Sequence, residues 1–172
     1  STQLIAAYVL ALQFAKIRSE ITEEQCDAYV KELKTLPEKI KRILEDKERL
    51  QWFASKQANA KDIFFIGRGI DYAISLEGSL KMKEISYIHS EAYAAGELKH
   101  GTISLIEDGT LVIGVLTQPK LYEKTISNMV ECKSRGAYLM GLTTFGNYNT
   151  EDTADFTVYI PKTDPHFATS LA

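Results

Sequence analysis

The chain has 172 residues, 45% of them hydrophobic, and a formal net charge of -3 near neutral pH, with a mean hydropathy of -0.16. These values describe a globular protein that can bury an ordinary core, with no cationic bias toward nucleic acid or anionic membranes. No apolar run reaches the length of a membrane span and no signal-peptide pattern opens the chain, so we expect a cytoplasmic protein without membrane attachment. The two cysteines and three histidines show no metal-site spacing. We therefore expect free thiols, no metal and no cofactor.

The first sixty residues predict helices. Residues 1–17 are apolar on nearly all sides, as in a helix whose packing partners lie upstream. Thr22 and Gln25 have the spacing of a capping box, and Pro37 suits the first turn of another helix. Residues 21–60 are therefore interpreted as a helical connector. Residues 166–172 read as the start of a further helix, and we expect the chain to be a fragment of a longer polypeptide.

From residue 61 the pattern changes to alternating strands and helices. Apolar, β-rich runs predict strands at 63–66, 111–116, 137–142 and 156–160, and a helix is predicted at 120–135. The strands do not alternate polar and apolar residues, which favours a parallel sheet with helices on both faces. In such sheets, ligands bind beyond the carboxyl ends of the strands.

The helix predicted after the first strand carries three charged residues at unusual places. With 100° of turn per residue, its apolar side chains fill one arc, and Glu77, Lys81 and Glu84 fall in the middle of that arc. Their spacing of i, i+4 and i+7 stacks them within reach of one another. A solvated salt-bridge ladder would contribute little, and a buried structural ion pair or a subunit contact is the other alternative. We interpret the three residues as a buried polar pocket with perturbed pKa values, suited to acid and base chemistry.

Two further signals are weaker when taken alone. The Gly67-Arg68-Gly69 turn lacks the pattern of a dinucleotide or P-loop site, so it reads either as a tight strand-to-helix turn or as a turn whose amides meet an anion. His100 ends a glycine-broken segment and is by itself more often structural than catalytic.

The segment EISYIHSEAYAAGELKHG, which follows IGRG and the intervening helix, resembles the second sugar isomerase (SIS) domain of glutamine-fructose-6-phosphate aminotransferase. The resemblance implies an SIS-type three-layer α/β sandwich. It assigns residues 1–20 to the last helix of a preceding SIS domain, 21–60 to the connector and 61–172 to most of the second SIS domain, truncated at its C-terminus.

The resemblance also implies an activity and roles. The family makes glucosamine 6-phosphate from fructose 6-phosphate and glutamine-derived ammonia. Glu84 would be the base that moves a proton between C1 and C2 of the sugar, with Lys81 beside it at the C1 oxygen and Glu77 fixing the lysine. His100 would open the sugar ring across a subunit boundary, which implies a homodimer. Sugar-phosphate binding would involve Lys81, Glu84 and His100.

Several parts of the family pattern have no counterpart in this sequence. The glutaminase domain with its nucleophilic cysteine, most of the first SIS domain and the tail lysine that forms a Schiff base are missing. The loop at Thr117-Gln118-Pro119 has a single hydroxyl, so we expect poor phosphate binding and an inactive fragment. A non-catalytic sugar-phosphate-sensing SIS module and a structural dimerisation domain are the alternative functions.

Overall fold

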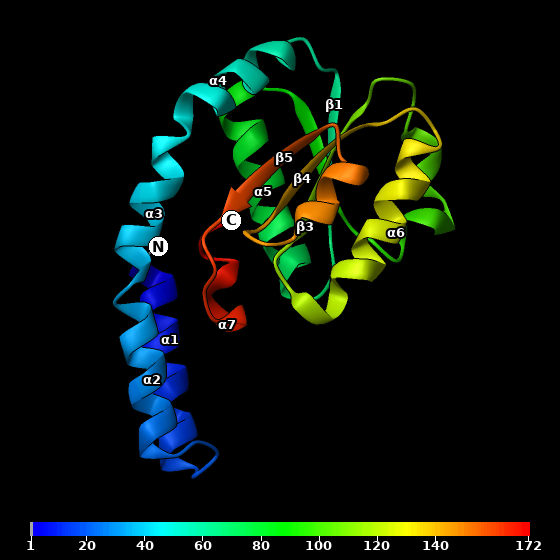
Figure 1. The fold of residues 1–172 in the computed structure, drawn as a ribbon. Coiled ribbons are helices and arrows are strands. Elements are labelled where there is room, and N and C mark those ends of the chain that lie inside the picture. Colours follow the sequence, from blue (N-terminus) through cyan, green and yellow to red (C-terminus); the bar gives the residue numbers. More distant parts are fainter. Residues whose placement is uncertain (1) are drawn as a thin grey trace.

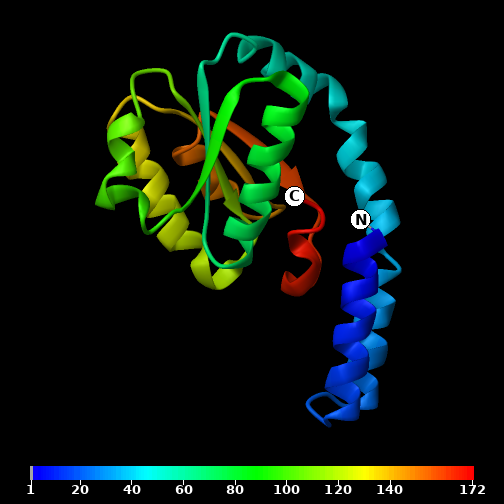
Figure 2. The ribbon, with the colours of Figure 1, turned by 180° about the vertical axis from the view of Figure 1, so that it is seen from behind.

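The computed structural model describes residues 2–172 as a sheet domain with a helical extension (Figure 1). The extension contains α1 (Thr2–Ile17), α2 (Glu23–Leu33), α3 (Leu36–Glu45) and α4 (Lys47–Lys56). Helices α1 and α2 run side by side away from the sheet in both views (Figures 1 and 2). The predicted capping box is confirmed, because Thr22 accepts a hydrogen bond from the amide of Gln25 and the Gln25 side chain accepts from the Thr22 amide. Pro37 lies in the first turn of α3, as predicted.

The sheet has five parallel strands in the order β2-β1-β3-β4-β5. The strands are β1 (Asp62–Gly67), β2 (His89–Ala94), β3 (Leu111–Leu116), β4 (Tyr138–Thr144) and β5 (Phe156–Ile160). Four of them were predicted. Strand β2 was missed, because its sequence HSEAYA is largely polar, as suits an edge strand that pairs on one side only.

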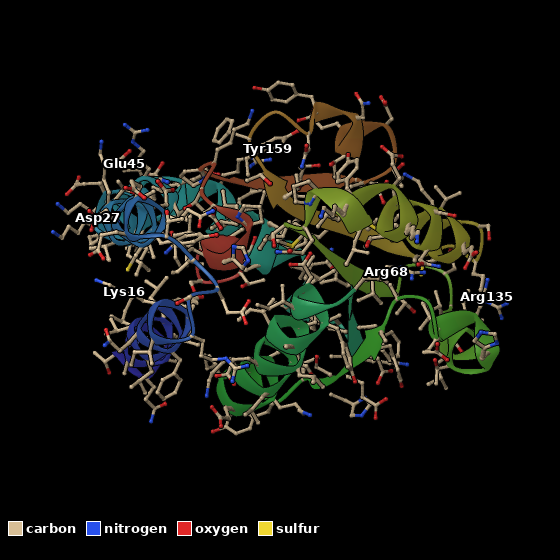
Figure 3. The ribbon with its side chains drawn as sticks, turned by 90° about the horizontal axis from the view of Figure 1, so that it is seen from below. Lys16, Asp27, Glu45, Arg68, Arg135 and Tyr159 are labelled. Carbon is tan, nitrogen blue, oxygen red and sulfur yellow. The ribbon has the colours of Figure 1, made fainter. Side chains whose placement is uncertain are left out.

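Helices cover both faces of the sheet, which confirms the three-layer architecture (Figure 3). Helices α4 and α5 (Ile70–Ser86) lie over one face, where Phe53 and Met82 pack on a cluster that includes Ile63 and Phe65. On the other face, α6 (Tyr122–Lys133) packs Met129 and Cys132 onto Val112 and its neighbours. The short helices η1 (Leu98–His100) and η2 (Thr102–Leu105) belong to this second face, since Leu98 is part of the same cluster.

A third apolar cluster joins the extension to the sheet domain. The short helix α7 (Pro165–Ala168) contributes Phe167, which packs with Leu36 of α3 and Ile160 of β5. Tyr8 of α1 meets the Phe167 ring edge to face, with the ring centroids 4.9 Å apart. Helix α1 is thereby held beside the domain, although none of its residues is buried. Within residues 2–172, no helix is long and apolar enough to cross a membrane.

Candidate functional site

Helix α5 presents to the sheet the face opposite to the one expected from its hydrophobic pattern. Its buried residues are Asp71, Ser75 and Ser79, whereas the predicted apolar arc is largely exposed, up to 78% for Ile85. Small side chains explain this orientation, because they let the helix backbone come close to the sheet. A Cβ atom built on Gly78 would lie 3.0 Å from the Phe65 ring, and the Ser79 hydroxyl donates to the Ser90 carbonyl of β2 at 2.8 Å. Close approach and hydrogen bonding have decided which face is buried.

The charged ladder therefore lies on the open side of α5, and the prediction of a buried pocket around it is wrong for this chain. The side chains of Glu77, Lys81 and Glu84 are 55%, 50% and 52% exposed. Lys81 donates to Glu84 with an Nζ to Oε2 distance of 2.7 Å, and its Nζ lies 3.5 Å from Oε1 of Glu77. The hydrogen bond to Glu84 raises the pKa of Lys81, so the lysine stays an ammonium and holds the two carboxylates together.

Two hollows adjoin the ladder. One, of about 560 Å³, lies between α1, α5 and the segment after α7, and the other, of about 230 Å³, lies between α5 and the sheet. Glu77 lines both, and Lys81 lines the second. The first is lined by Gln3, Leu4, Tyr8, Ile70, Ala73, Ile74, Glu77, Thr169 and Ser170. The second is lined by Phe65, Ile74, Glu77, Gly78, Lys81, Ile113, Val115, Leu142 and Ala172. We call the second hollow the groove: Glu77 and Lys81 line it beside apolar walls, and Glu84 adjoins it through its hydrogen bond to Lys81.

His100 is not part of that groove. It is exposed at the end of η1, which packs through Leu98 on the sheet face that α6 covers. Figures 1 and 2 place the η1–η2 segment and α5 on opposite sides of the sheet. A single copy of the chain therefore brings Glu77, Lys81 and Glu84 together but leaves His100 on the other side.

A buried carboxylate that the sequence analysis did not single out lies where β1 and β3 end. Asp71, in the first turn of α5, is 2% exposed and accepts hydrogen bonds from the Thr117 amide at 2.8 Å, the Gln118 amide at 3.2 Å and the Thr117 hydroxyl at 2.5 Å. Burial raises the pKa of Asp71, and the three donors oppose that rise. One signal could have found it, since Asp71 and Thr117 follow two successive predicted strands, and the carboxyl ends of parallel strands meet at one edge of a sheet.

The turn after β1 is a structural junction. Gly69 has φ of 59° and ψ of -128°, a conformation that residues with a side chain rarely adopt. Arg68 donates to the side-chain oxygen of Asn128 in α6 from Nη2 at 2.9 Å and from Nε at 3.2 Å. Figure 3 shows Arg68 near the level of the sheet, between the two helical layers. Of the two alternatives for this turn, the structure supports the strand-to-helix junction.

Comparisons with known proteins agree with this architecture. Residues 57–172 match the family described as SIS domain. The chain is 52% identical over 163 residues to the glutamine-fructose-6-phosphate aminotransferase (isomerizing) of Caldanaerobacter subterraneus subsp. tengcongensis, which covers 95% of this chain and 27% of that protein. The corresponding protein of Clostridium tetani is 50% identical over 171 residues, or 99% of this chain and 28% of that protein.

A solved structure is also similar over nearly the whole chain. The C-terminal domain of glucosamine-fructose-6-phosphate aminotransferase from Francisella tularensis matches with a TM-score of 0.91 and 31% identity, over 99% of this chain and 48% of that one. The chain spans about a quarter of the length of the curated relatives it matches. The family model covers more than half of the 172 residues, and the sheet, its order and its two helical layers fit it. The chain therefore belongs to the SIS domain family.

Proposed function

We propose that the chain is part of the isomerase half of an enzyme that makes glucosamine 6-phosphate from fructose 6-phosphate and glutamine-derived ammonia. The observation that carries this proposal is the ladder of Glu77, Lys81 and Glu84, in a chain 52% identical to an enzyme of that name. Glu77 and Lys81 line an open groove, and Glu84 is hydrogen-bonded to Lys81 beside it. We also propose a cytoplasmic protein, with residues 1–20 closing a preceding SIS domain, 21–60 acting as the connector and 61–172 forming the second SIS domain.

In this proposal, Glu84 takes a proton at one sugar carbon and returns it at the neighbouring carbon. Lys81 stays charged beside Glu84, as its raised pKa supports, and stabilises negative charge that develops on the C1 oxygen. Glu77 holds Lys81 from the other side, because its carboxylate lies one helical turn before the lysine. The apolar side chains around the ladder would exclude water once the groove is covered.

His100 would act on the substrate bound to a second copy of the chain. The support is geometric, since η1 and α5 lie on opposite sides of one sheet and a single copy cannot place both at one sugar. A homodimer can bring η1 of one subunit to α5 of the other. The sugar phosphate, the second subunit and the glutaminase and first SIS domains of the same polypeptide are the proposed partners.

The test is Glu84→Gln in the full-length enzyme, with glucosamine 6-phosphate formation as the readout. Loss of a positioned base worth roughly 10² to 10⁴ in rate should lower turnover by several hundredfold, while the circular dichroism spectrum stays unchanged. Glu123→Gln is the matched control, because Glu123 is an exposed carboxylate on α6, away from the groove. Turnover of Glu84→Gln within a few-fold of the Glu123→Gln level would exclude Glu84 as the base.

A further inference from the structure

Strands β1 and β3 are neighbours at the point where the sheet changes its direction of growth. From β1 the chain passes through α5 to β2 on one side, and it then returns to β3 on the other side. In open parallel sheets, ligands bind at such a switch point, beyond the carboxyl ends of the strands. The residues that leave β1 and β3 here are those around Asp71 and Thr117. This crevice is the position at which the fold class offers a ligand site.

The crevice already contains a negatively charged group from the chain itself. Both carboxylate oxygens of Asp71 are used, Oδ1 by the Thr117 hydroxyl and Oδ2 by the amides of Thr117 and Gln118. Two successive backbone amides and a hydroxyl that converge on one oxyanion form the donor set with which loops bind phosphate or carboxylate. Thr117 is 2% exposed, like Asp71, so its amide and hydroxyl are closed to solvent, whereas Gln118 is half-buried. The nearby guanidinium of Arg68 donates to Asn128, and none of the ion pairs recorded for residues 2–172 involves Asp71.

We propose that the switch point of this module is an oxyanion site whose resident anion is the Asp71 carboxylate, so that no external phosphate enters it. A hydrogen bond that only held the start of α5 to the loop after β3 could use a neutral side chain, because a neutral group avoids the desolvation of a buried charge. A carboxylate is favoured where the surrounding donors are arranged for an anion. The inference does not depend on the enzyme activity proposed above. It adds that the phosphate of any sugar phosphate bound by this module must be held outside this crevice.

The experiment empties the site and refills it from solution. Asp71→Ala removes the carboxylate and leaves its three donors without an acceptor. Asp71→Asn is the matched control, because it keeps the size of the side chain and fills the site without a charge. Thermal unfolding of the 172-residue chain and both variants is measured in sodium formate and in sodium chloride of equal ionic strength. Formate is the probe because it has the size of the carboxylate that was removed.

We expect formate to stabilise Asp71→Ala specifically, with saturation. For a dissociation constant on the order of 10 mM, 100 mM formate raises the ratio of folded to unfolded chain about tenfold over chloride. The wild-type chain and Asp71→Asn should respond equally to the two salts. The last measurement adds inorganic phosphate to the wild-type chain at about 10 mM, a concentration that occupies sites with millimolar dissociation constants. The amide resonances of Thr117 and Gln118 should not shift.

The proposal is overturned if Asp71→Ala shows no preference for formate, if the wild-type chain shows the same preference, or if phosphate shifts the two amide resonances. If Asp71→Ala does not fold in chloride, its recovery of fold on dilution into formate is the expected result. Asp71→Ser is the second variant, since its short hydroxyl leaves most of the carboxylate position empty. Absence of a formate effect in both emptied variants contradicts an anion site.

Discussion

Gly67 closes β1 and marks the closest approach between that strand and the helix that carries the candidate site. A Cβ atom at this position would lie 2.6 Å from both the carbonyl carbon and the carbonyl oxygen of Asp71, and 2.8 Å from the amide nitrogen of Tyr72. These neighbours are backbone atoms at the start of α5. Ordinary contacts of a Cβ atom begin near 3.4 Å. Gly67→Ala therefore requires the strand or the helix to move by most of an ångström.

Neither element can move freely. Gly67 is paired with Ala94 of β2, and its carbonyl accepts a hydrogen bond from the Ala95 amide at 2.9 Å. The start of α5 is held to the loop after β3 through Asp71. Overpacking of a core typically costs about 1 to 3 kcal/mol, and we expect about 3 kcal/mol here because no flexible side chain can absorb the clash.

Gly96→Ala is the matched comparison. Its Cβ atom would meet Nη2 of Arg68 at 2.8 Å, a similar distance, but the neighbour is the end of a flexible side chain. The guanidinium can turn away and donate to water instead of Asn128, at a cost of about 1.5 kcal/mol, the lower end for hydrogen bonds from a charged group. The smaller entropy of the unfolded alanine chain offsets about 0.4 to 1 kcal/mol of that loss. We expect a net change below about 1 kcal/mol.

Urea unfolding at equilibrium measures both variants. With a slope of about 2 kcal/mol per molar urea, Gly67→Ala should lower the midpoint by roughly 1.5 M, and Gly96→Ala by less than about 0.5 M. The slopes should equal that of the wild-type chain. Equal midpoints for the two variants would contradict this expectation. They would show that the distance from the added Cβ atom to its nearest neighbour, and not the rigidity of that neighbour, sets the loss of stability.

Three other expectations can be measured directly. If His100 acts across a dimer, mixing full-length Glu84→Gln with His100→Gln should restore up to about a quarter of wild-type activity. Random pairing makes half of the dimers mixed, and each mixed dimer contains one intact site out of two. If no activity returns, both residues act within one subunit. The exposed apolar faces of α1 and α5 should make the chain self-associate at concentrations on the order of tens of micromolar, above ordinary dimer dissociation constants. The double variant Leu76→Gln and Leu80→Gln should weaken the self-association without loss of stability. An unchanged sedimentation profile of this variant would exclude α5 from the contact. Burial raises the pKa of the Cys132 thiol to about 12. A disulfide reagent at pH 8 should therefore modify the partly exposed Cys26 in the folded chain, and Cys132 only after the chain unfolds. Rapid modification of both thiols in the folded chain would contradict the packing of α6.

The parallel sheet was predictable because burial on both faces leaves a plain signature. Strand β3, LVIGVL, is buried at all six positions, and its bounds agree with the prediction. Strand β2 has no such signature, because an edge strand can carry His89 and Glu91 in contact with solvent. The orientation of α5 was not predictable from hydrophobicity. Ser75, Ser79 and Gly78 make a close helix-to-sheet contact that outweighs burial of the larger apolar residues.

For the candidate site as well, one part could be predicted from the sequence and the other could not. The spacing of Glu77, Lys81 and Glu84 along one helix predicts that they meet, and the distances agree. The exposure of this ladder was wrongly predicted, because it depends on which face of α5 meets the sheet. The separation of His100 from the ladder depends on tertiary structure alone, since η1 follows β2 around the edge of the sheet to its other face. No local pattern in ELKHG contains that information.

The exposed ladder also sets a condition for catalysis. Ion pairs that are half exposed contribute little, because water and salt screen them. A carbon acid requires a base of higher pKa, which a carboxylate gains when apolar surface replaces its water. Leu76, Leu80 and Ile85 supply one half of that surface around the ladder. We therefore expect Glu84 to become an effective base only when a second apolar surface covers α5, so that assembly and chemistry are coupled at this helix.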